Sequence, residues 1–455
     1  MVSQNKTLRY YQWLIAEYFK KHFKLILLSF FLTVIFVLST ISIFPYLSSF
    51  FISKKTIIGL VGRYDINNLP DEVYSNISNG LVSINEKGEI IPALITSWEV
   101  VDNGREYHFQ LRKDLLWNDG KPFNANNLGY NFKDIEIKAT GEYLVTFKLK
   151  KSLGVFPTYL TKPVIKYPLV GVAGLYKIEK SITNGSYIQE VQLMPNKKGL
   201  QPIVYKFYDN ESKMINAYKL GDINQMSINR KTIADILKKW RNTDVSEDVD
   251  YTHLMTLFVN LKNPLLKERN MRQAIEMAID RGTLAKEYGL EAIGPIPPVS
   301  WAYNPNIKKT SYNQDTAKNI IEKDFDASSS AKINFVTFYE YLDVANEIDR
   351  YLNEAGLKTS LNIASFGQNF DFDLLLAYFK VPNDPDQYFF WHSTQEKGNI
   401  SNYVNLKVDK LLEDARSVLN PTDRKQKYFE FQKVMADDTP AVFIYYPHVY
   451  TVKRK

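Results

Sequence analysis

Cysteine is absent from the 455 residues of this sequence. Its absence excludes disulfide bonds and the zinc, haem and iron–sulfur sites that need thiolate ligands. It equally excludes a lipid anchor attached to an N-terminal cysteine. Disorder along the whole chain is excluded as well, because 45% of the residues are hydrophobic and 14% are aromatic. On a prior of about 150 residues per domain, the length suggests roughly two to three domains.

Sequence motifs of the common enzyme classes are missing too. The chain has no Gly-x-Ser-x-Gly, no His-Glu-x-x-His, no Walker Gly-x-x-x-x-Gly-Lys and no Gly-x-Gly-x-x-Gly motif. The histidines stand singly, at His22, His108, His253, His392 and His448. Lone histidines more often pack or form hydrogen bonds than bind a metal. The sequence therefore predicts no catalytic residue, no cofactor and no metal site.

Positive charge is concentrated at the N-terminal end of the chain. The sequence has 57 Lys and Arg against 50 Asp and Glu, which gives a formal charge of +7. Residues 1–55 contain 7 of the basic residues and 1 acidic residue, which leaves 50 basic and 49 acidic residues in the remainder. The remainder is close to neutral, so it lacks the basic surface that nucleic acids require. We expect no nucleic-acid partner.

One long apolar run, from Leu25 to Ser53, has 29 residues without a formal charge. A bilayer core needs about 20 helical residues, and the excess of basic residues before the run places the N-terminus in the cytoplasm. We expect a basic cytoplasmic tail at 1–24, a single transmembrane anchor over the apolar run and an extracytoplasmic domain at 56–455. The alternative is a signal peptide cleaved near Ser48 or Ser49, although such peptides have apolar regions of only about 7–15 residues.

The first half of the extracytoplasmic part is predicted to be rich in strands. Residues 96–101 and 106–112 flank Asp102-Asn103-Gly104, and Asn-Gly between alternating runs is typical of a tight hairpin. In the second of these strands Tyr107, Phe109 and Leu111 share one face.

The second half is predicted to be rich in helices. Apolar residues recur at helical spacing over 271–279 and 408–418. A further helix is expected to begin after Asn420, a good N-cap, with Pro421 at its first position. Because strands and helices occur in separate blocks, we expect α+β lobes and not one doubly wound sheet.

Aromatic residues crowd around the turn Asp384-Pro385-Asp386. A second aromatic feature is Trp301, which follows the proline-rich run at 294–298. Aromatic side chains beside a rigid segment are typical of a concave ligand site. The two aspartates are compatible with a metal or acid–base site, but also with an ordinary solvated turn. The residues around the turn are Tyr378, Phe379, Tyr388, Phe389, Phe390 and Trp391.

Several segments resemble, in the right order, the extracellular solute-binding proteins of family 5, the peptide- and oligopeptide-binding receptors of ABC importers. The first is GEIIPALITSWEV at 88–100. The second is FVNLKNPLLKERNMRQAIEMAIDRGTL at 258–284. The third lies within 371–446 and includes DPD and SNYVNLKVDKLLEDAR. The resemblance spans about Thr56 to Val452.

The resemblance implies a two-lobed receptor of the periplasmic-binding-protein type (type II) with an extra subdomain. We expect lobe 1 at approximately 56–255, completed by a C-terminal return at 430–455, and lobe 2 at 256–429. The subdomain, at approximately 85–160, is expected to be short, because a helical excursion of the family after Phe132 is missing. Such a receptor closes on its ligand about a hinge and performs no covalent chemistry.

The resemblance and the composition together suggest a set of ligand-binding residues. In peptide receptors of this family, an aspartate before the Asp-Pro-Asp turn pairs with the free amino group of the peptide. Val381 occupies that place here, so either Asp384 or Asp386 replaces the aspartate or the ligand has no free amino group. The expected residues are Tyr378, Phe379, Val381, Asp384, Asp386, Trp391 and Trp301.

The expected function is therefore that of a membrane-anchored, extracytoplasmic receptor of an ABC importer. It would capture peptides or related small solutes and deliver them to permease subunits and their ATPases. Its expected location is the cell membrane, with one pass and the ligand-binding domain outside. The alternative is a tethered sensor or scaffold that has kept the fold but not transport.

Overall fold

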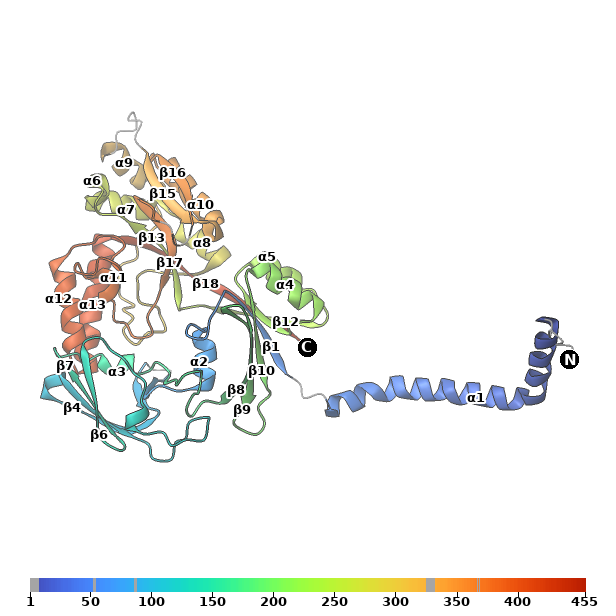
Figure 1. Cartoon of the computed structure of the whole chain (residues 1–455). Helices are drawn as coiled ribbons and strands as arrows, with labels where there is room; N and C mark the ends of the chain where they lie inside the picture. Colours follow the sequence, from blue (N-terminus) through green and yellow to red (C-terminus); the bar gives the residue numbers. More distant parts are fainter. Residues whose placement is uncertain (1–7, 52–54, 86–87, 325–331, 366, 368) are drawn as a thin grey trace.

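The long N-terminal helix α1 (Leu8–Phe51) extends away from the folded body in Figure 1. The computed structural model describes residues 8–51, 55–85, 88–324, 332–365, 367 and 369–455. Within α1, Tyr10–Thr40 is apolar and long enough to cross a membrane, and its most apolar window is not buried against other parts of the chain. This span overlaps the predicted anchor over residues 25–40. Residues 1–7 of the predicted tail and the predicted end at Ser53 lie outside the described residues.

The two lobes are built on one 12-stranded mixed sheet, ordered β16-β15-β17-β13-β18-β11-β1-β10-β9-β8, with β12 and β14 paired to β18. In lobe 1, β1 lies parallel to β10, although the whole subdomain separates these strands in the sequence. Lobe 1 contains β1 (Thr56–Val61), α2 (Asp71–Ile77), β8 (Tyr176–Asn184), β9 (Tyr187–Pro195), β10 (Ile203–Tyr208), α4 (Glu211–Leu220), β11 (Gln225–Ile228), α5 (Lys231–Lys238) and β12 (Thr243–Val249).

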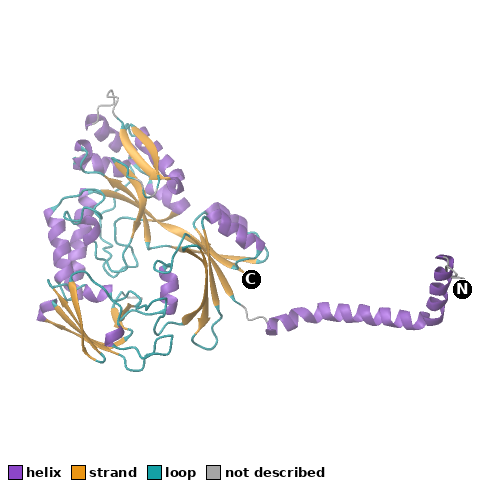
Figure 2. Ribbon diagram, in the orientation of Figure 1, coloured by secondary structure: helices purple, strands orange, loops and turns teal. Residues whose placement is uncertain are grey.

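Lobe 2 surrounds its strands with helices (Figure 2). In β13, Met255 and Leu257 point into one hydrophobic core, whereas Leu254 and Phe258 point into another. Both faces are covered, so this strand is apolar nearly throughout. Lobe 2 contains β13 (His253–Val259), α6 (Pro264–Lys267), α7 (Arg269–Ala278), α8 (Arg281–Tyr288), β14 (Gly289–Glu291), α9 (Gln314–Asp324), β15 (Ile333–Phe338), α10 (Leu342–Glu354), β16 (Thr359–Ala364), β17 (Leu374–Lys380), α11 (Tyr388–Trp391), α12 (Leu406–Ser417) and α13 (Pro421–Asp438).

The last strand, β18 (Ala441–Arg454), joins the two lobes. Its first half pairs with β13 of lobe 2, and its second half pairs with β11 and β12 of lobe 1. The expected return at residue 430 falls inside α13, where Tyr428, Phe431 and Met435 are buried in a lobe 2 core. The lobes are mixed α and β, as expected, but they share one sheet through β18, which the separate blocks of strands and helices did not indicate.

The second crossing between the lobes is the short link 250–252, between β12 and β13. The backbone N–H of Asp250 donates a hydrogen bond to the carbonyl of Pro447 in β18, at 2.8 Å. The two crossings therefore lie side by side, which is the arrangement of a hinge.

The subdomain packs a four-stranded sheet, ordered β4-β5-β7-β6, over its own core. The predicted hairpin is confirmed, with Asn103 (φ 51°) and Gly104 (φ 85°) in the left-handed region. The core face of Tyr107, Phe109 and Leu111 is buried. The chain enters β6 directly after residue 134, without a helix. The elements are β2 (Val82–Ile84), β3 (Ile90–Pro92), β4 (Ile95–Val101), β5 (Glu106–Leu111), β6 (Ile135–Gly141), β7 (Leu144–Leu149) and α3 (Phe156–Tyr159).

The helices predicted from periodicity and capping are confirmed as α7, α12 and α13. At the start of α13, the Asn420 side chain accepts hydrogen bonds from the backbone N–H groups of Thr422 and Asp423, at 2.8 and 3.2 Å. These bonds satisfy amide groups that have no partner inside the helix.

Candidate functional site

Two adjoining cavities lie where the subdomain and the hinge face lobe 2, and we call them together the interlobe cleft. The larger has a volume of about 630 Å³ and the smaller about 400 Å³. Both are lined by Ile84 of the subdomain and by Pro382 and Asn383 of lobe 2. The larger cavity also takes residues from α3 and α11, whereas the smaller takes Tyr251 and Thr252 of the hinge and residues 297–301. The cleft is thus lined by the subdomain, the link 250–252 and lobe 2.

The loop after β17 forms the lobe 2 wall of the cleft. Its start is fixed by the Val381 N–H, which donates to the Thr252 carbonyl at 2.9 Å. The Asp384 carboxylate accepts from the Asp386 N–H at 3.0 Å, and the Asp386 carboxylate accepts from the Tyr388 N–H at 3.2 Å. Each aspartate therefore folds the turn that follows it, as Asx turns do.

Asp384 is paired with Arg424 of α13. The Nη1 of Arg424 donates to Oδ2 of Asp384 at 2.9 Å, and its Nη2 donates to Oδ1. The two side chains are only 12% and 9% exposed. Burial raises the pKa of the Asp384 carboxyl, and the Arg424 guanidinium opposes that rise. The guanidinium also lies over the ring of Trp301, 5.3 Å from its centroid. Asp384 and Arg424 thus form a structural ion pair within lobe 2.

Asp386 is paired with Arg416 of α12 and with Tyr159 of the subdomain. The Nε of Arg416 lies 3.1 Å from Oδ2 of Asp386, and the Tyr159 hydroxyl donates to the same oxygen at 3.2 Å. The Nη2 of Arg416 donates to the Tyr159 hydroxyl at 2.8 Å. Burial raises the pKa of Tyr159 to about 12, so the phenol stays protonated at neutral pH. This triad links the subdomain to lobe 2 across the cleft.

Further contacts join lobe 2 to the subdomain and to lobe 1. The N–H of Val155 donates to the carbonyl of Arg416 at 3.3 Å. Gly88 of the subdomain (φ 78°) lies directly against the indole of Trp301, where a Cβ atom would clash. Lys380 and Asp71 form an exposed ion pair at 3.7 Å between β17 and α2. These contacts join lobe 2 to the parts of the chain on the other side of the cleft.

Four of the seven residues predicted to bind ligand, Val381, Asp384, Asp386 and Trp301, line the cleft. The other three pack behind its wall. Phe379 and Trp391 are 2% and 1% exposed and belong to a lobe 2 core. The Tyr378 ring packs at 4.9 Å from that of Tyr341, and burial raises the Tyr378 pKa.

Other cleft residues were not predicted from the sequence. Ile84, Thr158, Tyr159 and Arg416 come from segments far apart in the chain and carry no motif. Phe389 was noted within the aromatic cluster and does line the larger cavity, half exposed.

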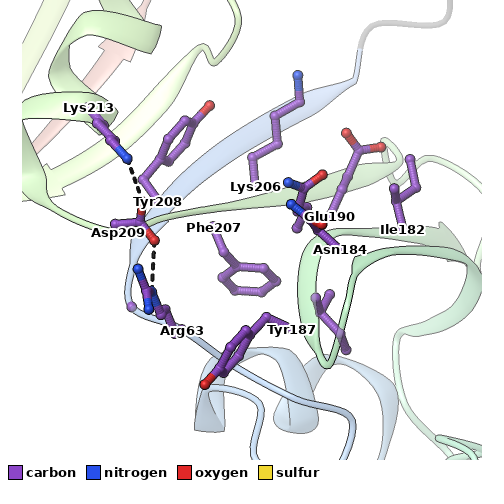
Figure 3. A pocket seen from close by; sticks show the side chains of 13 residues that line it. Arg63, Ile182, Asn184, Tyr187, Glu190, Lys206, Phe207, Tyr208, Asp209 and Lys213 are labelled. Carbon is purple, nitrogen blue, oxygen red and sulfur yellow. Dashed lines mark hydrogen bonds and ion pairs between the residues drawn. The ribbon is translucent and has the colours of Figure 1, made fainter.

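Another cavity, of about 690 Å³, lies within lobe 1 at the carboxyl ends of β1 and β10. Figure 3 shows Arg63 and Lys213 directed at Asp209, with Tyr187 beside Phe207. We call it the lobe 1 cavity. Its ion pairs are largely exposed, with Arg63 65% and Asp209 42% accessible. Its lining comes from lobe 1 alone, so closure of the lobes would not enclose a ligand there. The candidate site is therefore the interlobe cleft.

Among the described residues, no group of three or more His, Asp or Glu side chains is arranged to hold a metal ion. The chemistry that the cleft offers is hydrogen bonding, aromatic contact and charge pairing.

The sequence of the chain is similar to those of several named binding proteins. It is 25% identical over 472 residues to the oligopeptide-binding protein AppA of Bacillus subtilis, covering 86% of each chain. It is 24% identical to a probable D,D-dipeptide-binding periplasmic protein, DdpA, of Escherichia coli, over 77% of this chain and 78% of that one.

Solved structures share its fold. The structure of Bacillus subtilis AppA in complex with a nonapeptide matches with a TM-score of 0.71 and 21% identity, over 88% of this chain and 94% of that one. The ABC transporter substrate-binding protein CtaP of Listeria monocytogenes matches with a TM-score of 0.75 and 20% identity, over the same shares. These relatives are named as binding proteins and not as enzymes. The model of the bacterial extracellular solute-binding proteins, family 5, matches residues 89–401, and the chain belongs to this family.

Proposed function

We propose that this chain is the receptor of an ABC importer, held at the outer face of the membrane by α1, and that it captures peptides or related small solutes in the interlobe cleft. The observation that carries the proposal is the cleft itself, which has walls from the subdomain, the hinge and lobe 2. Each of its two cavities has a volume within the range of about 300–1,000 Å³ that is usual for small-molecule sites. The names of the relatives, one solved with a nonapeptide, favour a peptide.

In this proposal, closure of the interlobe cleft is what signals that a ligand is bound. A ligand stabilises the closed form only by the difference between its affinities for the closed and open forms. A solute that contacts both the subdomain and lobe 2 meets that requirement, because it loses its contacts with one of the two walls when the cleft opens. The triad of Tyr159, Asp386 and Arg416 closes at the same time, so it adds to the stability of the liganded state.

The membrane anchor supports the same function. The apolar span Tyr10–Thr40 lies in α1, which ends at Phe51, and β1 of lobe 1 begins at Thr56. A tether of this kind keeps a receptor near its permease and raises their effective concentration.

Binding is tested with the full chain in detergent micelles, mixed with a library of short peptides and observed by native mass spectrometry. Retention of one or more peptides supports the proposal, and the absence of any bound solute contradicts it. The anchor is tested by protease protection of the chain in membrane vesicles. An accessible body after Lys55 on the outer side, with the chain at its full mass, supports an uncleaved anchor.

Transport is tested by deleting the gene and measuring uptake of the retained solute. Loss of uptake supports a receptor that delivers to a permease. Unchanged uptake, with binding and closure intact, would instead support a tethered sensor or scaffold.

A further inference from the structure

The charged side chains of the interlobe cleft are few and already paired. Among the described residues, Asp384, Asp386 and Arg416 are the charged ones that line it. Glu86 and Lys87 lie outside the described residues. The identity of the ligand therefore depends on whether either aspartate is free to receive a positive charge.

Asp384 is not free. Both of its oxygens accept hydrogen bonds from Arg424, and Oδ1 also accepts from the Asp386 N–H. The pair is nearly buried, so water does not screen it. A ligand that took Asp384 would leave the Arg424 guanidinium buried without a counter-charge, which is strongly unfavourable.

Asp386 is engaged in the same way. Oδ2 is shared by Arg416 and Tyr159, and Oδ1 accepts from the Tyr388 N–H. Its side chain is 14% exposed. The two aspartates and their two arginines carry no net charge together.

Acids beside the cleft-lining residues are engaged as well. Glu89 accepts a hydrogen bond from the side-chain amide of Asn85 at 2.8 Å. Asp250, beside the hinge residues, accepts from Thr252 and lies 2.7 Å from Nδ1 of His253. Asp71 is 93% exposed, pairs with Lys380 and lines a different cavity. An acid so exposed binds a cation weakly, because water and salt screen the interaction.

The rest of the lining is neutral and suited to amides. Thr158, Thr161, Asn383 and Gln395 line the larger cavity, and Phe389 adds an aromatic ring. The hydroxyls of Thr158 and Thr161 already donate to the carbonyls of Val155 and Thr158, so they can only accept a further hydrogen bond. Groups of this kind can bond the N–H and C=O of a peptide backbone without any charge on the ligand.

We propose that the interlobe cleft selects peptides or peptide-like amides whose amino end carries no charge, such as N-acylated peptides. This inference rests on the proposed function and narrows it. An ammonium group entering the cleft loses its water and finds no unpaired carboxylate among the lining residues that the structure describes, whereas an acylated amino end loses far less water and is accommodated by the neutral lining.

The test compares two forms of the same probes, a set of tripeptide amides with uncharged side chains and free amino ends and the same set N-acetylated. Binding of each set to the full chain in detergent is measured by native mass spectrometry and by calorimetry at pH 7. The acetylated form is expected to bind about tenfold more tightly or better. Equal or tighter binding of the free-amino form overturns the inference but leaves the proposed function standing. Binding of neither form overturns both.

A gain-of-function variant gives a second readout. Val381 lines the smaller cavity and is uncharged. Val381→Asp places a carboxylate on that wall, and Val381→Asn is the matched control of nearly the same shape without the charge. The aspartate variant is expected to bind the free-amino probes about tenfold more tightly than the asparagine variant. That advantage is expected to disappear above about pH 8, where the α-amino group loses its proton.

The control for folding is the thermal unfolding curve of both Val381 variants. If both fold and the aspartate variant shows no advantage for free-amino probes, the selection does not arise from missing charge in the cleft, and the inference fails.

Discussion

The larger cavity of the interlobe cleft and the lobe 1 cavity are similar in size, and each contains an aspartate held by two basic or hydrogen-bonding partners. They differ in burial and in what they connect. The Asp384–Arg424 pair is about 10% exposed, whereas Arg63 and Asp209 in the lobe 1 cavity are mostly open to water. The cleft joins bodies that a hinge can separate, but the lobe 1 cavity belongs to one body. A cavity with ion pairs is therefore not by itself a ligand site. What distinguishes the cleft is that its charges are desolvated and its walls can move apart.

The largest expected effect comes from removing the buried cation. Arg424→Met leaves the Asp384 carboxylate buried without a partner, which we expect to lower the free energy of unfolding by about 3–5 kcal/mol. The matched change in the lobe 1 cavity, Arg63→Met, is expected to leave the melting temperature unchanged, because that pair is screened. Chemical denaturation of both variants measures the difference. Equal losses would show that burial does not separate the two regions.

The same variant predicts a pH dependence. Burial already raises the pKa of Asp384, and without Arg424 only the hydrogen bond from the Asp386 N–H opposes that rise. The folded variant then binds more protons than the unfolded chain, so its stability increases as the pH falls from 7 toward 5. The wild-type chain is expected to show a smaller gain over this range. A variant whose stability fell in parallel with the wild type would contradict the assignment.

The second effect is on closure. Tyr159→Phe removes the hydroxyl that bonds Arg416 and Asp386 across the cleft. Hydrogen bonds to charged groups contribute about 1.5–3 kcal/mol, so we expect ligand affinity to fall about tenfold. Tyr187→Phe in the lobe 1 cavity is the matched control and should not change affinity. Calorimetric titration of both variants shows which cavity binds the ligand. A loss of affinity in Tyr187→Phe alone would place the ligand in the lobe 1 cavity.

A smaller effect is expected from the exposed pair at the edge of the cleft. Lys380→Met removes the contact with Asp71, in which both side chains are more than 70% exposed. Affinity should fall less than about fivefold, and the difference from wild type should vanish at high salt. A titration repeated at low and at high ionic strength measures it. A large loss of affinity that does not depend on salt would mean that this pair also stabilises the closed form.

The smallest effect is on charge preference. Asp384 is neutralised by Arg424, so the paired change Asp384→Asn with Arg424→Met, which removes both charges together, should change the ratio of affinities for acetylated and free-amino probes by less than about twofold. Native mass spectrometry of mixed probes gives this ratio directly. A selective loss of free-amino binding would show that Asp384 does receive an ammonium group.

The sequence predicted those parts of the structure that depend on neighbouring residues. The hairpin at 102–104 and the start of α13 at Asn420 follow from residues within four positions of each other. The sheet shared through β18 could not be predicted in this way, because its pairings join segments about 200 residues apart.

The contacts in the interlobe cleft were still harder to predict from the sequence. Asp384 and Asp386, predicted from the sequence to bind ligand, do line the cleft, yet their partners Arg424, Arg416 and Tyr159 lie on other elements. Without those partners an aspartate appears available to a ligand. Only the packing of α12 and α13 against the loop after β17 shows that it is neutralised.

The most direct test of the account is a distance measurement between the lobes. The absence of cysteine allows two to be introduced and labelled selectively, as Leu220→Cys in lobe 1 and Leu406→Cys in lobe 2, where the native side chains are 80% and 83% exposed. Energy transfer between the two dyes is recorded while an N-acetylated peptide amide that native mass spectrometry shows to bind is added. The account predicts a saturable change in transfer, absent with the matching free-amino peptide. Saturated binding without any change in transfer would contradict it.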